Sequence, residues 1–183
     1  MAAAAPDVTG GRCARHTLAD MAERTSISET DRTHLARAVE LAEAALDAGD
    51  EPFGSLLVSA DGEVLLEDHN HVSGGDHTQH PEFAIARWSA QHLSPQERAA
   101  STVYTSGEHC PMCAAAHGWV GLGRIVYASS TEQLSRWGTE LGRQPGPVAP
   151  LPITTLVPGA VVAGPDEELA ERVRALHARK AGS

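Results

Sequence analysis

Apolar side chains recur every three or four positions between Ser28 and Gly49, and acidic side chains take the opposite positions. This spacing is typical of an amphipathic helix, and the glycine marks its end. Segment 53–59 then changes to a nearly continuous apolar run, and Asp61-Gly62 separates it from a second run at 63–68. A dipeptide of this kind between two strand-like runs predicts a β-hairpin.

Helix-like and strand-like segments alternate after the hairpin. We expect helices at 80–93, 110–122, 132–137 and 166–180, strands at 101–106 and 124–129, and a fifth, weaker strand at 153–157. This alternation predicts an α/β layered domain around a mixed sheet. Residues 1–27 show no clear period, so we predict a flexible N-terminal arm before a single domain at 28–183.

The composition narrows the partners of this domain. Hydrophobic residues make up 42% and charged residues 21% of the 183 residues, which is ordinary for one globular domain. No apolar run is long enough to span a membrane, and the alanine-rich start lacks the basic residues of a secretory leader. The formal net charge of −10 argues against nucleic acid as a partner, because phosphate backbones repel an acidic surface.

Two short segments carry the candidate chemistry, His80-Pro81-Glu82 and Cys110-Pro111-Met112-Cys113, while Cys13 stands alone. A close cysteine pair within an odd total favours a metal or redox site in the reducing cytoplasm over a disulfide framework. Each segment puts a proline directly after a possible ligand, and proline is favoured at the first helical position. We therefore expect His80 and Cys110 at the starts of two helices, with Cys113 on the same face one turn later.

A His/Cys/Cys set is the catalytic form of a zinc site, with a water in the fourth position, whereas a structural zinc takes four protein ligands. Glu82, two residues beyond His80, is placed to carry a proton from the activated water without being needed as a ligand. Alone, C-x-x-C is shared by redox pairs and zinc knuckles, and H-x-E is common by chance. Together and in this order they are the signature of zinc deaminases.

Segment 51–130 resembles the cytidine-deaminase-like superfamily, in particular the branch that contains guanine, cytosine and tRNA adenosine deaminases. Pro52-Phe53-Gly54 matches the P-F-G opening of that branch, and Asn70 takes the place of its asparagine after the second strand. The stretch 76–82 resembles its D-P-T-x-H-A-E motif, and the stretch 102–114 resembles its V-Y-x-T…P-C-x-M-C-x-x-A run.

The resemblance implies a three-layer α/β/α fold with a five-stranded mixed sheet, usually assembled as a dimer or higher oligomer. It also implies that His80, Cys110 and Cys113 hold zinc and that Glu82 is the proton carrier. By the same resemblance, Asn70 would hydrogen-bond the substrate ring and Phe53 would line the base pocket.

The sequence departs from the branch at His109, which replaces the proline before the first cysteine. We favour a solvent-facing side chain there over a group at the pocket edge, because histidine is often a polar surface residue. Trp137 and Glu140 follow the fourth predicted strand, where the superfamily often places substrate-specific residues. For both we favour a role outside the pocket.

The leading hypothesis is a cytoplasmic, zinc-dependent hydrolytic deaminase that converts the exocyclic amine of a free nucleobase or related heterocycle to a carbonyl. A guanine-like amino-purine is the first choice, with cytosine and triazine-type rings in the same class. The alternative enzyme is a tRNA adenosine-to-inosine deaminase, against which stand the acidic charge and the single lysine, Lys180. The alternative from another class is a non-catalytic, zinc-stabilised binding module, and the presence of Glu82 argues against it.

Overall fold

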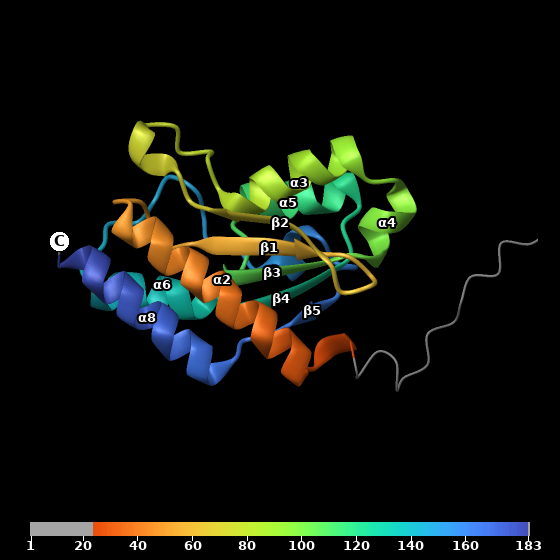
Figure 1. The fold of residues 1–183 in the computed structure, drawn as a ribbon. Coiled ribbons are helices and arrows are strands. Elements are labelled where there is room, and N and C mark those ends of the chain that lie inside the picture. The colour runs from red at the N-terminus through yellow and green to blue at the C-terminus, as the bar shows by residue number, and fades with distance from the viewer. Residues whose placement is uncertain (1–23, 183) are drawn as a thin grey trace, which may run out of the picture.

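Five strands of the described chain form a mixed sheet in the order β2-β1-β3-β4-β5 (Figure 1). The computed structural model describes residues 24–182, so most of the predicted arm at 1–27, with Cys13, lies outside the described residues. The strands are β1 (Gly54–Val58), β2 (Val64–His69), β3 (Thr102–Gly107), β4 (Arg124–Ser129) and β5 (Val162–Ala163). The five-stranded mixed sheet implied by the resemblance is confirmed.

The strand directions bring distant parts of the sequence together at one end of the strands. β1 and β2 form the predicted antiparallel hairpin, and Gly62 takes a positive φ of 84° in its turn. β1 also pairs antiparallel with β3, whereas β3 with β4 and β4 with β5 pair parallel. Because β1 runs against β3, the residues that precede β1 lie at the same end as those that follow β3 and β4.

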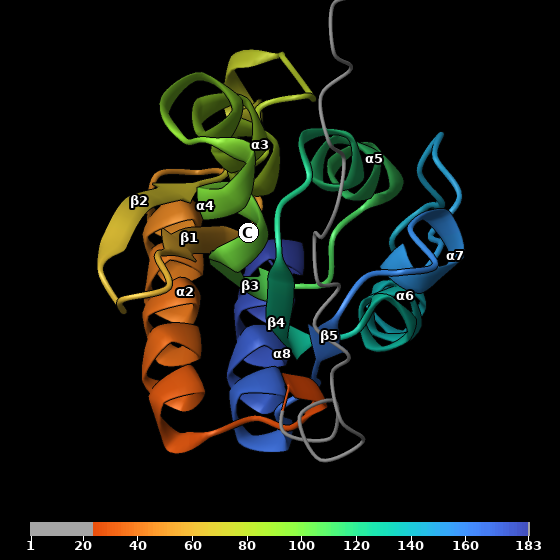
Figure 2. The same cartoon turned by 90° about the vertical axis from the view of Figure 1, so that its right-hand side faces the viewer.

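Helices cover both faces of the sheet (Figure 2). α2 (Glu29–Asp47) and α8 (Glu167–Ala181) pack on one face, and α3 (Pro81–His92) and α5 (Pro111–Val120) pack on the other. The connections contain α4 (Pro95–Ala100), α6 (Thr131–Glu140), α7 (Ile153–Leu156) and the 3-10 turn η1 (Val72–Gly74). The predicted three-layer α/β/α arrangement is confirmed. Among the helices of residues 24–182, none is both long and apolar enough to cross a membrane.

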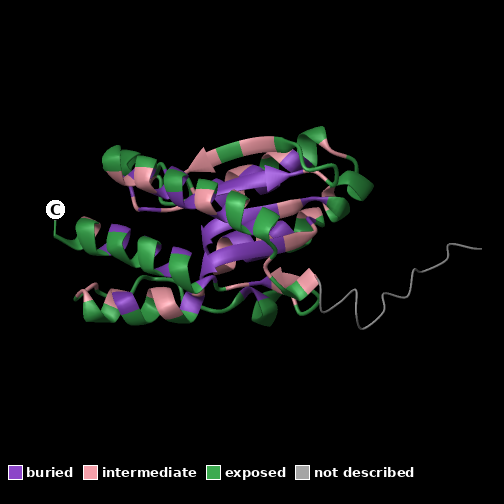
Figure 3. Ribbon diagram, turned by 60° about the horizontal axis from the view of Figure 1, so that its bottom comes forward, coloured by how far each residue is buried: buried purple, intermediate pink, exposed green. Residues whose placement is uncertain are grey.

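The sheet separates two hydrophobic cores, because successive side chains of a strand point to opposite faces. In β1, Leu56 and Val58 pack toward α2 and α8, whereas Leu57 packs toward α3 and α5. Every residue of β1 is buried, while the outer faces of the covering helices are exposed (Figure 3). The continuous apolar run of this strand therefore reflects burial on both sides.

Side-chain caps explain where several helices begin. Ser28, Ser94 and Ser130 each accept a hydrogen bond from the backbone N–H three residues later, and the side chain of that third residue bonds back to the cap. This reciprocal pair is a capping box. The box at Ser94 starts α4, which the hydrophobic pattern did not predict because none of its residues is buried.

The prediction of a fifth strand at 153–157 is wrong. These residues begin with the short helix α7, and the fifth strand is β5, which pairs with β4 through Val162 and Ile125. The Ile153 N–H donates to the Glu108 carboxylate (3.0 Å), and the Val157 N–H donates back to the Ile153 carbonyl (2.8 Å). A short apolar run fits either a strand or a helix, and here the backbone hydrogen bonds select a helix.

An ion pair between buried Asp31 and partly buried Arg124 joins α2 to the sheet. Arg124 Nη1 lies 2.7 Å from Asp31 Oδ1, and the Tyr104 hydroxyl donates to the same oxygen (2.8 Å). Burial alone would raise the pKa of Asp31, but hydrogen bonds from Arg124, Ser28 and Tyr104 outweigh it and lower this pKa to about 2. Asp31 is therefore a carboxylate that joins the first turn of α2 to β3 and β4.

Candidate active site

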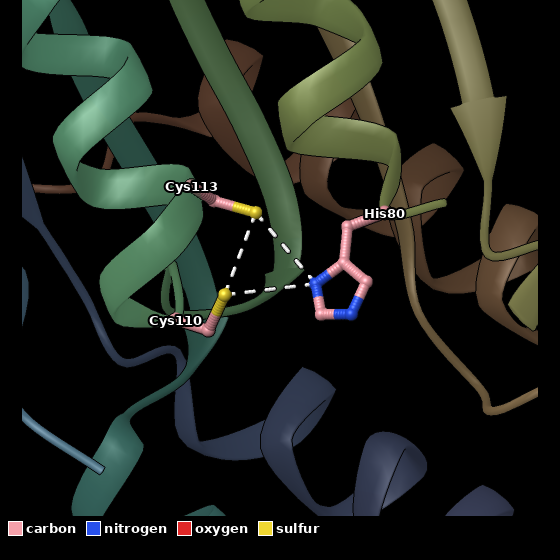
Figure 4. A group of neighbouring side chains, drawn as sticks. All are labelled: His80, Cys110 and Cys113. Atoms are coloured by element: carbon pink, nitrogen blue, oxygen red, sulfur yellow. Dashed lines mark hydrogen bonds between the residues drawn. The ribbon is translucent and has the colours of Figure 1, made fainter. Parts of the chain in front are cut away.

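The three residues predicted as metal ligands lie together at the starts of α3 and α5 (Figure 4). His80 is the N-cap of α3 and Cys110 is the N-cap of α5, and each is followed by proline, as predicted. His80 Nδ1 lies 3.6 Å from each sulfur, and the two sulfurs are 3.5 Å apart. Within the described residues, these three side chains form a group whose ligand atoms all fall within 4.8 Å of one another.

The geometry of this group fits a zinc ion. Tetrahedral zinc, with Zn–S of about 2.3 Å and Zn–N of about 2.0 Å, places its ligand atoms roughly 3.4–3.8 Å apart, which is close to the spacing of these side chains. One nitrogen and two sulfurs leave a fourth position for water or substrate. Cys113 is fully buried, whereas His80 and Cys110 are partly exposed. One ligand is therefore held by the core, and water or substrate can approach the group from the side of the other two.

The two thiols differ in charge. The pKa of Cys110 is lowered to about 4 by hydrogen bonds from Cys113 and His80. The same contact with Cys110, together with burial and the nearby Glu82 carboxylate, raises the pKa of Cys113. The hydrogen bond to Cys110 also raises the pKa of His80. The chain itself therefore stabilises one thiolate in this group, and thiolate is the form that binds zinc.

Glu82 lies in the first turn of α3, with only 5% of the residue exposed. Its Oε1 lies 2.9 Å from the Ser55 hydroxyl and 2.9 Å from the Thr105 hydroxyl, so its hydrogen-bond partners are two neutral groups. Burial raises the pKa of Glu82 above its ordinary value. Sequence reasoning missed both hydroxyls, although polar residues inside the apolar strands β1 and β3 were a usable signal.

Phe53 and Asn70, the predicted substrate contacts, lie next to each other at the open end of the hairpin. The Asn70 N–H donates to the Phe53 carbonyl (3.0 Å), and the buried Asn70 side-chain oxygen accepts from the Val72 N–H (3.2 Å). A methyl group added at Gly107 would lie 3.0 Å from Phe53 Cε1, so the ring packs at the end of β3. Thr105 Oγ1 also lies 2.9 Å from the Gly107 carbonyl, which connects this pair to the partners of the buried glutamate.

The expectation of a solvent-facing His109 is wrong. This residue is 1% exposed and makes an edge-to-face contact with His117, with 5.3 Å between the ring centroids. Burial and His117 lower the pKa of His109 well below its ordinary value, so its ring is neutral. The chain passes directly from β3 into α5, and this short path encloses the side chain against the helix. Residue type suggested solvent, but tertiary packing decided the position.

Glu108, which sequence reasoning did not single out, ties the segment before the cysteines to two helices. Its Oε2 accepts the Thr131 N–H (2.8 Å) and its Oε1 accepts the Ile153 N–H (3.0 Å). These N–H groups belong to the first residues of α6 and α7. The partners lie 23 and 45 residues away in the sequence, so no local pattern could identify them.

Trp137 and Glu140 contribute to the packing of α6 and α8. Trp137 is 2% exposed within the core that α2 and α8 cover, and Glu140 pairs with Arg174 at 3.2 Å. Both residues line a groove of about 430 Å³ between α6 and α8. The lining of this groove includes none of the predicted zinc ligands.

Residues 28–129 match the family described as the cytidine and deoxycytidylate deaminase zinc-binding region. That match spans more than half of the chain and includes His80, Glu82 and both cysteines of the group. The chain belongs to this family. It is a zinc-dependent deaminase, a hydrolase that acts on C–N bonds. The resemblance stated from the sequence and the zinc cofactor are confirmed.

Relatives of this deaminase carry names from two substrate classes. A probable cytosine deaminase of Schizosaccharomyces pombe is 33% identical over 121 residues, which cover 66% of this chain and 74% of that protein. A guanine deaminase of Bacillus subtilis is 36% identical over 99 residues, covering 53% of this chain and 63% of that protein. A tRNA-specific adenosine deaminase of Haemophilus influenzae is 32% identical over 104 residues, covering 56% and 60%.

Solved structures share the fold. The guanine deaminase from Nitrosomonas europaea aligns with a TM-score of 0.63 at 18% identity, over 89% of this chain and 92% of that chain. The guanine deaminase from Bacillus subtilis aligns with a TM-score of 0.51 at 28% identity, over 69% of this chain and 89% of that chain. The first of these likenesses extends well beyond the family match and includes most of the described chain.

Proposed function

We propose that this deaminase hydrolyses the exocyclic amine of a free nucleobase or a related heterocycle, giving the carbonyl compound and ammonia. In this proposal His80, Cys110 and Cys113 hold the zinc ion and Glu82 moves the protons. The observation that carries the proposal is the placement of Glu82. Its carboxylate is buried two residues beyond His80, and two hydroxyls fix its Oε1.

Held by His80, Cys110 and Cys113, a zinc ion would supply a bound water that loses a proton near neutral pH. Glu82 would accept that proton and pass it to the ring nitrogen beside the reacting carbon. It would then take the remaining proton of the hydroxyl added to that carbon and deliver it to the amine, which leaves as ammonia while the carbonyl forms. Ser55 and Thr105 hold one carboxylate oxygen, 2.9 Å from each hydroxyl, so the carboxylate keeps one orientation through both transfers. Phe53 lines the ring face and Asn70 hydrogen-bonds the ring edge.

The charge of the chain favours a small neutral substrate over RNA. The formal net charge is −10, and an RNA-binding surface needs unpaired cations. Within residues 24–182, many arginines already pair with acidic side chains. They are Arg32, Arg37, Arg124, Arg136, Arg143, Arg174 and Arg179. We take a guanine-like amino-purine as the first candidate, with cytosine and triazine-type rings next, since relatives named guanine and cytosine deaminase match this chain.

The second candidate function is adenosine deamination in tRNA. It is favoured by the 32% identity to a tRNA-specific adenosine deaminase of Haemophilus influenzae, and the paired arginines oppose it. A non-catalytic zinc module is a third candidate. A buried carboxylate with only hydroxyl hydrogen-bond partners is costly for a purely structural domain, so Glu82 opposes that candidate.

The deciding experiment measures ammonia release by the zinc-loaded protein. The panel contains guanine, cytosine, adenine, amino-triazines, their nucleosides and a tRNA anticodon stem-loop, with Glu82→Gln as the inactive control. Turnover of a free base supports the proposal. Turnover of the stem-loop alone transfers the function to tRNA editing, and no turnover of any substrate at full zinc occupancy supports the binding module.

The proposal includes a cytoplasmic homodimer. Cysteine ligands stay reduced in the cytoplasm, and the superfamily that the sequence resembles usually assembles as a dimer. Light scattering on the zinc-loaded protein tests the assembly directly, because a monomeric mass at micromolar concentration would exclude a stable dimer.

A further inference from the structure

Two polar side chains, His177 and Arg143, form a second group near Phe53, apart from the zinc group. His177 of α8 places its ring against Phe53, with 5.1 Å between the centroids and 64° between the ring planes. Arg143 follows α6, and its Nη1 lies 3.3 Å from Glu51, two residues before Phe53. The C-terminal helix thus reaches Phe53 directly, and the segment after α6 reaches Glu51, two residues before Phe53.

Two nitrogen atoms of this group are buried without a hydrogen-bond partner, His177 Nε2 and Arg143 Nη2. His177 is only 3% exposed, so its ring is enclosed by protein. A buried polar group without a partner is destabilising, and native proteins leave few of them unsatisfied. Because Arg143 also lies close enough to His177 to lower its pKa, these two nitrogens on neighbouring side chains point to a place where a polar ligand supplies the missing partners.

Phe53 connects this place to the proposed chemistry. Its ring packs at Gly107, where an added methyl group would lie 3.0 Å from Phe53 Cε1. Gly107 is the last residue of β3, three residues before Cys110, and its carbonyl lies 2.9 Å from Oγ1 of Thr105, the hydroxyl partner of Glu82. A substrate ring that stacks on Phe53 therefore lies at the end of β3, where the chain leads to the zinc group.

The charge of the group suits an uncharged ligand. Burial, with the neighbouring Arg143 cation, lowers the pKa of His177 to about 3, so the imidazole is neutral at pH 7. The charge of Arg143 is balanced by Glu51. A neutral ring and a neutralised guanidinium offer hydrogen bonds without the net positive charge that a phosphate requires.

We propose that His177 and Arg143 hydrogen-bond the edge of an uncharged heterocyclic base that stacks on Phe53, and that they select which base is deaminated. This inference rests on the proposed function and assigns the polar end of the same pocket. A free base with ring nitrogens and a carbonyl fits this arrangement, since neither side chain offers a net positive charge.

The test compares kcat and KM for the best free base among wild type, His177→Phe, His177→Gln and Arg143→Met. His177→Phe keeps an aromatic ring against Phe53 and removes both nitrogens. His34→Phe is the matched control, because His34 contacts the ring of Tyr104 (4.8 Å between centroids) on the α2 side of the sheet. Calorimetric titration of guanine and cytosine into Glu82→Gln protein, with and without His177→Phe, measures binding without turnover.

We expect His177→Phe and Arg143→Met each to raise KM about tenfold, with kcat within a few-fold of wild type, because one hydrogen bond to the ring is lost. His177→Gln should be milder, and His34→Phe should leave both constants unchanged. If a free base is turned over and neither variant changes KM or the calorimetric Kd beyond twofold, this inference is wrong while the proposed function stands. Turnover of the stem-loop alone overturns the proposed function itself. If His177→Phe fails to fold by circular dichroism, Arg143→Met and His177→Gln decide.

Discussion

Two buried carboxylates, Asp31 and Glu82, lie on opposite faces of the same sheet and have opposite electrostatics. Asp31 bonds to the Arg124 guanidinium, and its pKa is lowered to about 2. Glu82 has hydroxyl partners, and burial raises its pKa. A cation beside a carboxylate fixes its charge and holds the fold together, whereas a buried carboxylate with neutral partners remains able to gain and lose a proton.

A single strand serves both carboxylates. Tyr104 and Thr105 are neighbours on β3, and neighbouring side chains of a strand point to opposite faces. The Tyr104 hydroxyl donates to Asp31 (2.8 Å), and the Thr105 hydroxyl lies 2.9 Å from Glu82. The difference between the two carboxylates therefore comes from the guanidinium that is hydrogen-bonded to Asp31 and has no counterpart among the hydrogen-bond partners of Glu82, since both carboxylates have a hydroxyl from the same strand.

The largest expected effect comes from Glu82→Gln, which tests whether this carboxylate, unlike Asp31, transfers protons. Glutamine keeps the shape and the contacts to Ser55 and Thr105 but cannot carry a proton. We expect kcat to fall by about 10³-fold, within the range for loss of a general acid–base, while zinc content and thermal unfolding stay near wild type. Steady-state kinetics with metal analysis checks this, and activity within a few-fold of wild type would remove Glu82 from the mechanism.

The second change, Asp31→Asn, leaves the partly buried Arg124 cation without its counter-charge. We expect the free energy of unfolding at pH 7 to fall by about 3 kcal/mol, as when other buried ion pairs lose one partner, with kcat unchanged. Urea titrations followed by circular dichroism measure it. A variant as stable as wild type would show that the ion pair does not hold α2 to the sheet.

The same pair predicts how stability depends on pH. The folded pKa of Asp31, about 2, lies below its ordinary value of 3.8. The stabilisation from this carboxylate is therefore present above pH 4 and is lost as the pH falls toward 2. The stability difference between wild type and Asp31→Asn should shrink over that interval. A constant difference from pH 7 to pH 2.5 would contradict the assigned charge state.

Glu108 adds a third buried carboxylate, whose partners are backbone N–H groups of α6 and α7. Glu108→Gln keeps one acceptor oxygen and turns an NH₂ group toward the other N–H. We expect a loss of about 2 kcal/mol in stability, and weaker zinc binding because the segment before Cys110 loosens. Thermal melts and chelator competition measure the two effects. Glu97→Gln, at an exposed capping box, is the matched control and should leave zinc affinity unchanged.

The smallest expected effect comes from Ser55→Ala, which removes one of the two hydroxyls at Glu82. A single buried hydrogen bond contributes about 1 kcal/mol, so kcat should fall several-fold with little change in stability. Thr105→Val should act similarly through the other hydroxyl. If the double variant keeps wild-type kcat, the hydroxyls do not orient the carboxylate.

Local signals predicted most of the fold and the zinc group. The prolines after His80 and Cys110 marked the helix starts, and Asp61-Gly62 marked the hairpin. Each of these signals is local, because it depends on the backbone dihedral angles that the residue itself favours. The fifth strand was misplaced because β5 has only the two residues Val162 and Ala163, too few to show a period. Strand order then followed from pairing, which a single sequence does not record.

Long-range contacts explain what the sequence could not reveal at the site. His109 looked like a surface histidine, yet its neighbour is His117 across the start of α5. His177 carried no motif, and it reaches Phe53 only because α8 packs back across the sheet. The role of Ser55 and Thr105 at Glu82 is visible only in the pairing of β1 with β3, where Ser55 lies opposite Thr105.

The meeting of His80 with Cys110 also affects the unfolded chain. These residues are 30 positions apart, and a metal ion bound to both closes a loop of that length, as a disulfide would. In a chain-entropy treatment, such a crosslink is worth roughly 3–4 kcal/mol if it persists in the unfolded state. A bound metal ion would thus act as a reversible crosslink between the starts of α3 and α5. Chelation would then slow refolding as well as abolish catalysis, because the segments that carry His80 and Cys110 would have to come together without the crosslink.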